Sequence, residues 1–134
     1  MMFSRFTPAK AGVAALTVLG FLFLFHLCVL LGLLPDGVVW GGSVSGEDAV
    51  TMEIVALLIT VLFAMVAAGR AGLILRTLPG CVFAAGSWVM TVYFLFNTAG
   101  NLFSASSTER AVFLPVSVVL FFLSLFLAVK GNER

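Results

Sequence analysis

AGVAALTVLGFLFLFHLCVLLGLL, residues 11–34, contains no Lys, Arg, Asp or Glu and decides the fold class of this chain. Its roughly 24 residues exceed the ~20 that an α-helix needs to cross a hydrocarbon core about 30 Å thick. Three further apolar runs follow at residues 49–68, 78–98 and 111–129. The sequence therefore predicts an all-α polytopic membrane protein in which residues 1–134 form one membrane domain, an antiparallel bundle of four transmembrane helices.

The composition supports the same class. The chain is 62% hydrophobic and 10% charged, with a mean hydropathy of +1.21. A soluble domain of 14.2 kDa has too small an interior to bury that much apolar surface, so we expect the lipid bilayer to cover the excess. The net charge of +1 and the lack of a Lys or Arg run argue against binding to nucleic acid.

The cations predict the orientation of the four helices. If the N-terminus lies in the cytoplasm, every Lys and Arg except Arg110 falls on the cytoplasmic side. We therefore expect both termini inside, with the protein in a bacterial cytoplasmic membrane. The segment 70–77 should then be a short, basic inner loop.

Helix ends carry local signals. Glu47 and Asp48 suit the positive end of a helix that begins near Gly46. Ser106 followed three residues later by Glu109 has the spacing of a capping box at the start of the fourth helix. Pro115 removes an amide donor one turn further on and should bend that helix.

A stripe of small and polar residues predicts which face of the second helix meets protein. Glu53, Ala56, Thr60, Ala64 and Ala67 recur at helical spacing. Small side chains let membrane helices approach closely, so this stripe should face the bundle and the opposite face should meet lipid.

The polar residues inside the apolar runs are few, and they share one depth. At 1.5 Å per residue, Glu53, His26 and Tyr93 lie roughly 6–12 Å below the outer boundary, with Asn97 close to that boundary. An ionisable side chain facing lipid there would be costly. We therefore predict one polar cluster, open to the outside, of His26, Glu53, Tyr93, Asn97 and, in addition, Asn101.

The outer loop between the first two helices contains Val38, Val39 and Trp40 between glycines. An indole suits the headgroup boundary, so Trp40 can be an interfacial anchor. The alternative is that this loop covers the polar cluster and that Trp40 contributes to a site.

His26 and Glu53 also have structural interpretations. A lone His on an apolar helix is more often a packing residue than a ligand or proton relay. Glu53 can be a proton or cation site, or a carboxylate that helps the helices recognise one another. Both interpretations stay open for each residue.

Other kinds of site find little support. Cys28 and Cys81 fall at opposite depths, so an intrachain disulfide is not expected. One His cannot supply two haem ligands within a monomer, and the donors for a zinc site do not cluster. We expect no metal, no cofactor and no phosphate or dinucleotide loop.

A whole-chain resemblance adds to this interpretation. The chain resembles a group of small bacterial four-helix integral membrane proteins with no assigned function. The matching features are His26, Pro35, VWGG at 39–42, Glu53, NTAGNL at 97–102, Glu109 and Pro115. The resemblance implies a shared fold and a shared polar site, without implying a reaction.

Three functions follow from these observations. The first is a non-enzymatic membrane protein whose outer-leaflet pocket binds a small ligand, an ion or a segment of a membrane partner. The second is an oligomeric transporter or channel that uses Glu53 as its coupling carboxylate, and the third is an enzyme that modifies a lipid or quinone with His26 and Glu53. A transporter requires an aqueous path past Thr60, whereas a binding protein requires a closed inner half.

Overall fold

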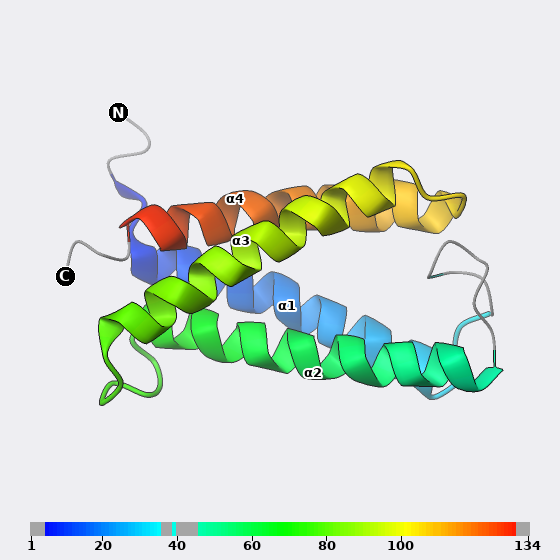
Figure 1. The fold of residues 1–134 in the computed structure, drawn as a ribbon, viewed down its shortest axis with the longest axis horizontal. Coiled ribbons are helices and arrows are strands. Elements are labelled where there is room, and N and C mark those ends of the chain that lie inside the picture. The colour runs from blue at the N-terminus through cyan, green and yellow to red at the C-terminus, as the bar shows by residue number, and fades with distance from the viewer. Residues whose placement is uncertain (1–4, 36–38, 40–45, 131–134) are drawn as a thin grey trace.

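The computed structural model describes residues 5–35, 39 and 46–130 and is all-α over that part of the chain. Four α-helices form a bundle (Figure 1). They are α1 (Pro8–Leu30), α2 (Gly46–Arg70), α3 (Gly80–Leu102) and α4 (Leu114–Lys130), with a π-helical turn, η3 (Glu109–Phe113), directly before α4. Four segments are long and apolar enough to cross a membrane: α1, α2, α3 and the combined η3–α4.

Local capping residues, and not the limits of the apolar run, determine where α1 begins and ends. Thr7 caps the helix, because its hydroxyl accepts a hydrogen bond from the amide of Lys10 at 3.3 Å. Pro8 then occupies the first turn, where its missing N–H costs nothing. At the other end, Gly32 has a φ of +72°, and the amide of Leu33 bonds the carbonyl of Cys28 at 2.9 Å. This glycine-based cap ends α1 before the apolar run does.

The start of the fourth transmembrane segment follows the expected signals in part. The amide of Glu109 donates to the hydroxyl of Ser106 at 3.4 Å, which is one half of the predicted capping box. The turn that follows is π-helical, and the amide of Leu114 bonds the carbonyl of Glu109. Because Pro115 has no amide hydrogen, it cannot donate to the carbonyl of Ala111, and the irregular turn lies directly before it.

The helices associate as two pairs, α1 with α2 and α3 with α4 (Figure 1). The pairs converge at one end of the bundle and separate toward the other. We call the end that holds the start of α1, the α2–α3 turn and the end of α4 the terminal half. The other end, which holds η3, is called the pocket half for the reason given below.

Glycines bring the helices together in the terminal half. A Cβ on Gly12 would lie 2.7 Å from the carbonyl oxygen of Ala67, which places α1 against α2. A Cβ on Gly69 would lie 2.1 Å from the ring of Phe83, which places α2 against α3. A Cβ on Gly86 of α3 would lie 2.7 Å from the side chain of Val66 on α2. Close approach through small residues is how membrane helices pack.

Arg70 belongs to this packed region, and the expectation that it lies in a basic loop is wrong. It is the last residue of α2, and only 3% of it is exposed. Its Nε donates to the hydroxyl of Ser87 on α3 at 3.3 Å. Because α2 runs on to Arg70, this side chain is held between helices.

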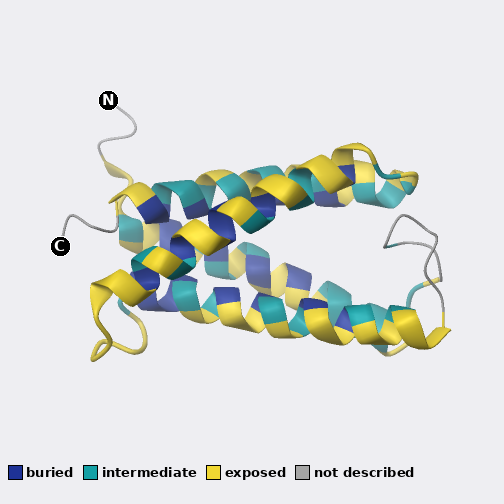
Figure 2. Cartoon of the chain, in the orientation of Figure 1, coloured by how far each residue is buried: buried dark blue, intermediate teal, exposed yellow. Residues whose placement is uncertain are grey.

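The predicted inward stripe of α2 is buried. Glu53, Ala56, Thr60 and Ala67 are buried, and Ala64 is half-buried. The opposite face is exposed over Ile54, Leu58, Val61 and Met65. Figure 2 shows exposed residues on the outward faces of the helices, as expected where lipid rather than water is the neighbour.

Candidate binding pocket

His26 on α1 and Glu53 on α2 lie against one another, as the cost of burying each of them predicted. His26 Nδ1 and Glu53 Oε2 are 2.7 Å apart. The side chain of Glu53 is 2% exposed and that of His26 is 16% exposed. The pair therefore links the first two helices at a depth where water is scarce.

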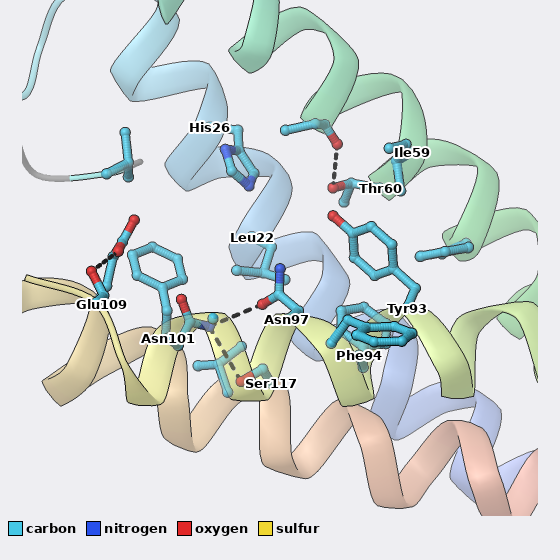
Figure 3. Close-up of a pocket in the computed structure, with 18 residues that line it drawn as sticks. Leu22, His26, Ile59, Thr60, Tyr93, Phe94, Asn97, Asn101, Glu109 and Ser117 are labelled. Atoms are coloured by element: carbon cyan, nitrogen blue, oxygen red, sulfur yellow. Dashed lines mark hydrogen bonds between the residues drawn. The ribbon is translucent and has the colours of Figure 1, made fainter. Parts of the chain in front are cut away.

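The pair occupies one of the two imidazole nitrogens. The hydrogen bond between His26 Nδ1 and Glu53 Oε2 orients the ring. The Nε2 atom is then left for another partner. His26 lines a pocket, and Figure 3 shows its ring directed from α1 toward α3.

The pocket lies between the two helix pairs and has a volume of about 380 Å³. All four helices contribute to its wall, together with η3 and Val39. Much of the wall is apolar: Leu22, Ala56, Ile59, Phe63, Phe94, Phe96, Phe113 and Val116. This size and this apolar character are typical of sites for small molecules.

A row of polar side chains on α3 lines the same pocket. Tyr93, Asn97 and Asn101 are spaced by four residues, which puts them on one face of the helix. The Nδ2 of Asn101 donates to Asn97 Oδ1 at 2.9 Å and to the hydroxyl of Ser117 on α4 at 3.3 Å (Figure 3). These bonds join α3 to α4 and hold the amide of Asn97 in place.

Tyr93 is held by aromatic neighbours. Its ring centroid lies 5.1 Å from that of Phe63 on α2 and 5.2 Å from that of Phe94. Edge-to-face contacts of this kind add to burial. Its hydroxyl points toward Thr60 across the pocket (Figure 3). Thr60 itself donates to the carbonyl of Ala56 at 2.7 Å.

Glu109 is a pocket residue that the sequence interpretation missed. Its carboxylate bonds the hydroxyl of Ser104, and both residues line the pocket. The capping-box spacing gives Glu109 a local role, and the sequence carries no separate signal for a second one. Thr60, which was interpreted as part of the small-residue stripe of the second helix, also lines the pocket, as does Ser117.

The pocket ends inside the bundle. Phe63 and Phe94, which are 4% and 3% exposed, form its inner wall. Beyond them, Leu19, Met90 and Leu120 are 0–1% exposed. This apolar layer separates the pocket from the terminal half.

A second hollow of about 400 Å³ lies between α1 and α2 on the outside of the bundle. Thr60 borders both hollows, but it is the only polar side chain among the described residues of the second. Leu16, Phe23 and Met65 are typical of the rest of its lining. An apolar surface of this kind gives water no path.

Trp40 lies outside the described residues, so its predicted part in the site stays a prediction. Val39, its neighbour, is half-buried and lines the pocket. Among residues 5–35, 39 and 46–130, no cluster of three or more His, Cys, Asp or Glu side chains could hold a metal ion. Cys28 is half-buried, Cys81 is exposed, and both are free thiols.

Comparison with known proteins gives no relative. No family model, curated protein or solved structure matches the chain. The resemblance to small bacterial four-helix membrane proteins stays a prediction.

Proposed function

We propose that this protein is a non-enzymatic membrane protein that binds a small ligand in the pocket half of the bundle. In this proposal the four helices cross the membrane in alternating directions, with both termini in the cytoplasm. The pocket then lies in the outer leaflet. The lipid bilayer, together with a second copy or a membrane partner, surrounds the helices.

One observation carries the proposal: the pocket is closed toward the terminal half. Leu19, Met90 and Leu120 offer no polar side-chain atom to a travelling ion. The nearby hydroxyls of Thr91 and Ser124 donate to carbonyls of their own helices. Glycine contacts on α2 and α3 close the same half further down. A ligand that reaches the pocket therefore leaves by the way it came.

The alternative, a transporter or channel coupled through Glu53, finds less support. Glu53 is paired with His26 and does not itself line the pocket. A coupling carboxylate has to meet the transported ion, and here the imidazole stands between them. The third alternative is catalysis by His26 and Glu53. It requires a further group that reacts with the substrate, and the described residues of the pocket wall do not identify one.

Ion flux separates binding from transport. The purified protein is reconstituted in liposomes loaded with a pH-sensitive dye, and proton and potassium flux are measured for the wild type and for Glu53→Gln. Binding predicts no flux above that of protein-free liposomes in either case. Thr51→Val is the matched control, because Thr51 is exposed on α2 and its hydroxyl bonds the carbonyl of Glu47 and no other described residue.

Flux in the wild type that Glu53→Gln abolishes and Thr51→Val preserves would overturn the proposal in favour of transport. Flux that all three share would indicate a path through the terminal half, which the proposal also excludes. An ionophore added at the end of each run establishes that the liposomes are intact.

A further inference from the structure

Three polar groups in the pocket wall have hydrogen-bonding capacity that the protein does not use. His26 Nε2, the amide nitrogen of Asn97 and the hydroxyl of Tyr93 form no hydrogen bond within the described part of the chain. Figure 3 shows all three directed into the same space. Polar groups in an apolar wall gain by binding a ligand that satisfies them.

The charges of the wall favour an uncharged ligand. No Lys or Arg is among the described residues that line the pocket, so an anion would find no cation there. Among these described residues Glu109 is the one carboxylate, and it is already bonded to Ser104. His26 faces the ligand, and its Nδ1 is already bonded to Glu53.

The apolar wall is built for a flat molecule. Phe63, Phe94 and Phe113 present aromatic rings from three different elements. A pocket of about 380 Å³ has room for a compound of one or two rings. Ring faces and edges pack well against such a compound.

The pocket is closed on one side of the bundle and open on the other. Between α1 and α4, the rings of Phe25 and Phe113 are in edge contact with centroids 4.6 Å apart. On the edge of α3 next to Tyr93, Phe96 is 72% exposed and Gly100 has no neighbour within 4 Å of an added Cβ. Both residues line the pocket, so it reaches the lipid-facing surface between α2 and α3.

The geometry points to an uncharged, lipid-soluble ring compound that carries hydroxyl or carbonyl oxygens, reaching the pocket from the bilayer between α2 and α3. This inference rests on the proposed binding function and names the class of ligand. The ring occupies the aromatic wall, while its oxygens bond Asn97, Tyr93 and His26 Nε2. As acceptor or donor, the imidazole suits either a hydroxyl or a carbonyl.

Four probes of similar shape test the proposed class of ligand. The full-length protein in lipid nanodiscs is dialysed against 1-naphthol, 1,4-naphthoquinone, 1-naphthylmethylammonium and 1-naphthoate, with empty nanodiscs as the blank. We expect saturable binding of at least one of the two uncharged probes, about tenfold or more tighter than that of either ion. Tighter binding of the cation or of the anion overturns the inference.

Variants of the polar row test the mode of binding. Tyr93→Phe and Asn97→Leu should each weaken binding of the better uncharged probe by about fivefold to tenfold, the loss expected for one hydrogen bond. Thr98→Val is the matched control on the same helix, because the Thr98 hydroxyl bonds the carbonyl of Phe94 at 2.7 Å and Thr98 does not line the pocket. Equal binding by all three variants overturns the inference. Tyr93→Phe removes one oxygen only, so it serves if Asn97→Leu does not fold.

Failure of the ligand class and failure of the pocket are distinguishable. Binding of a charged probe that Ser117→Trp abolishes would overturn the class and keep the binding function, because Ser117 lies in the pocket wall. No saturable binding of any probe overturns the class. In that case, thiol labelling of Asn97→Cys decides whether the pocket itself is open.

Discussion

The terminal half and the pocket half differ in how closely their helices approach one another. In the terminal half, Gly12 and Gly69 let neighbouring helices approach so closely that a methyl group would not fit. In the pocket half, the glycine of α3 at position 100 has open space around it. There, specific polar bonds such as that between His26 and Glu53 join the helices. The helices of this small bundle thus pack closely in the terminal half and leave room for a site in the pocket half.

The largest expected effect comes from breaking the polar link of the pocket half. His26→Leu should lower the free energy of unfolding by about 3 kcal/mol, because it removes the imidazole from a buried carboxylate. The double variant His26→Leu/Glu53→Leu should lose clearly less, since no charge is then left buried. Unfolding in a titration of mixed micelles with SDS measures both. A double variant as unstable as the sum of its two single variants would show that the pair is not coupled.

A smaller effect, of opposite sign between the halves, is expected at the glycines. Gly69→Ala should destabilise the protein by about 1–3 kcal/mol, because the new methyl group meets the ring of Phe83. Gly100→Ala is the matched change in the pocket half and should be neutral or stabilising within about 0.5 kcal/mol, because Ala favours helix. The same SDS titration serves for both variants. Equal losses at the two positions would remove the distinction between a packed half and an open half.

Elementary physical chemistry predicted much of this architecture from the sequence. Apolar runs of sufficient length gave the four helices, and the cost of burying ionisable groups brought His26 and Glu53 together. Both predictions follow from the properties of the bilayer as a solvent, and neither requires knowing how the side chains pack. With so few ionisable residues available, the partner of a buried carboxylate was easy to identify.

Other features could not be predicted, because each depends on the fold. Arg70 ends an apolar run, as a residue facing water would, yet it is buried because α2 and α3 meet at that point. Glu109 has a sufficient local role as part of a helix cap, so only the separation of the two helix pairs reveals it as a pocket residue. The glycine that ends α1, Gly32, lies within an unbroken apolar run. The hydropathy of this run does not indicate that the backbone changes direction at Gly32.

The central claim is that the pocket is confined to one half of the bundle and closed toward the other. Asn97→Cys and Ser124→Cys, each in a background with Cys28→Ala and Cys81→Ala, test it in proteoliposomes with a membrane-impermeant thiol reagent applied from either side. Ser124 is fully buried in the terminal half, whereas Asn97 lines the pocket. The account predicts labelling of Asn97→Cys from one side of the membrane and no labelling of Ser124→Cys from either. Labelling of Asn97→Cys from both sides, or of Ser124→Cys from any side, would contradict it.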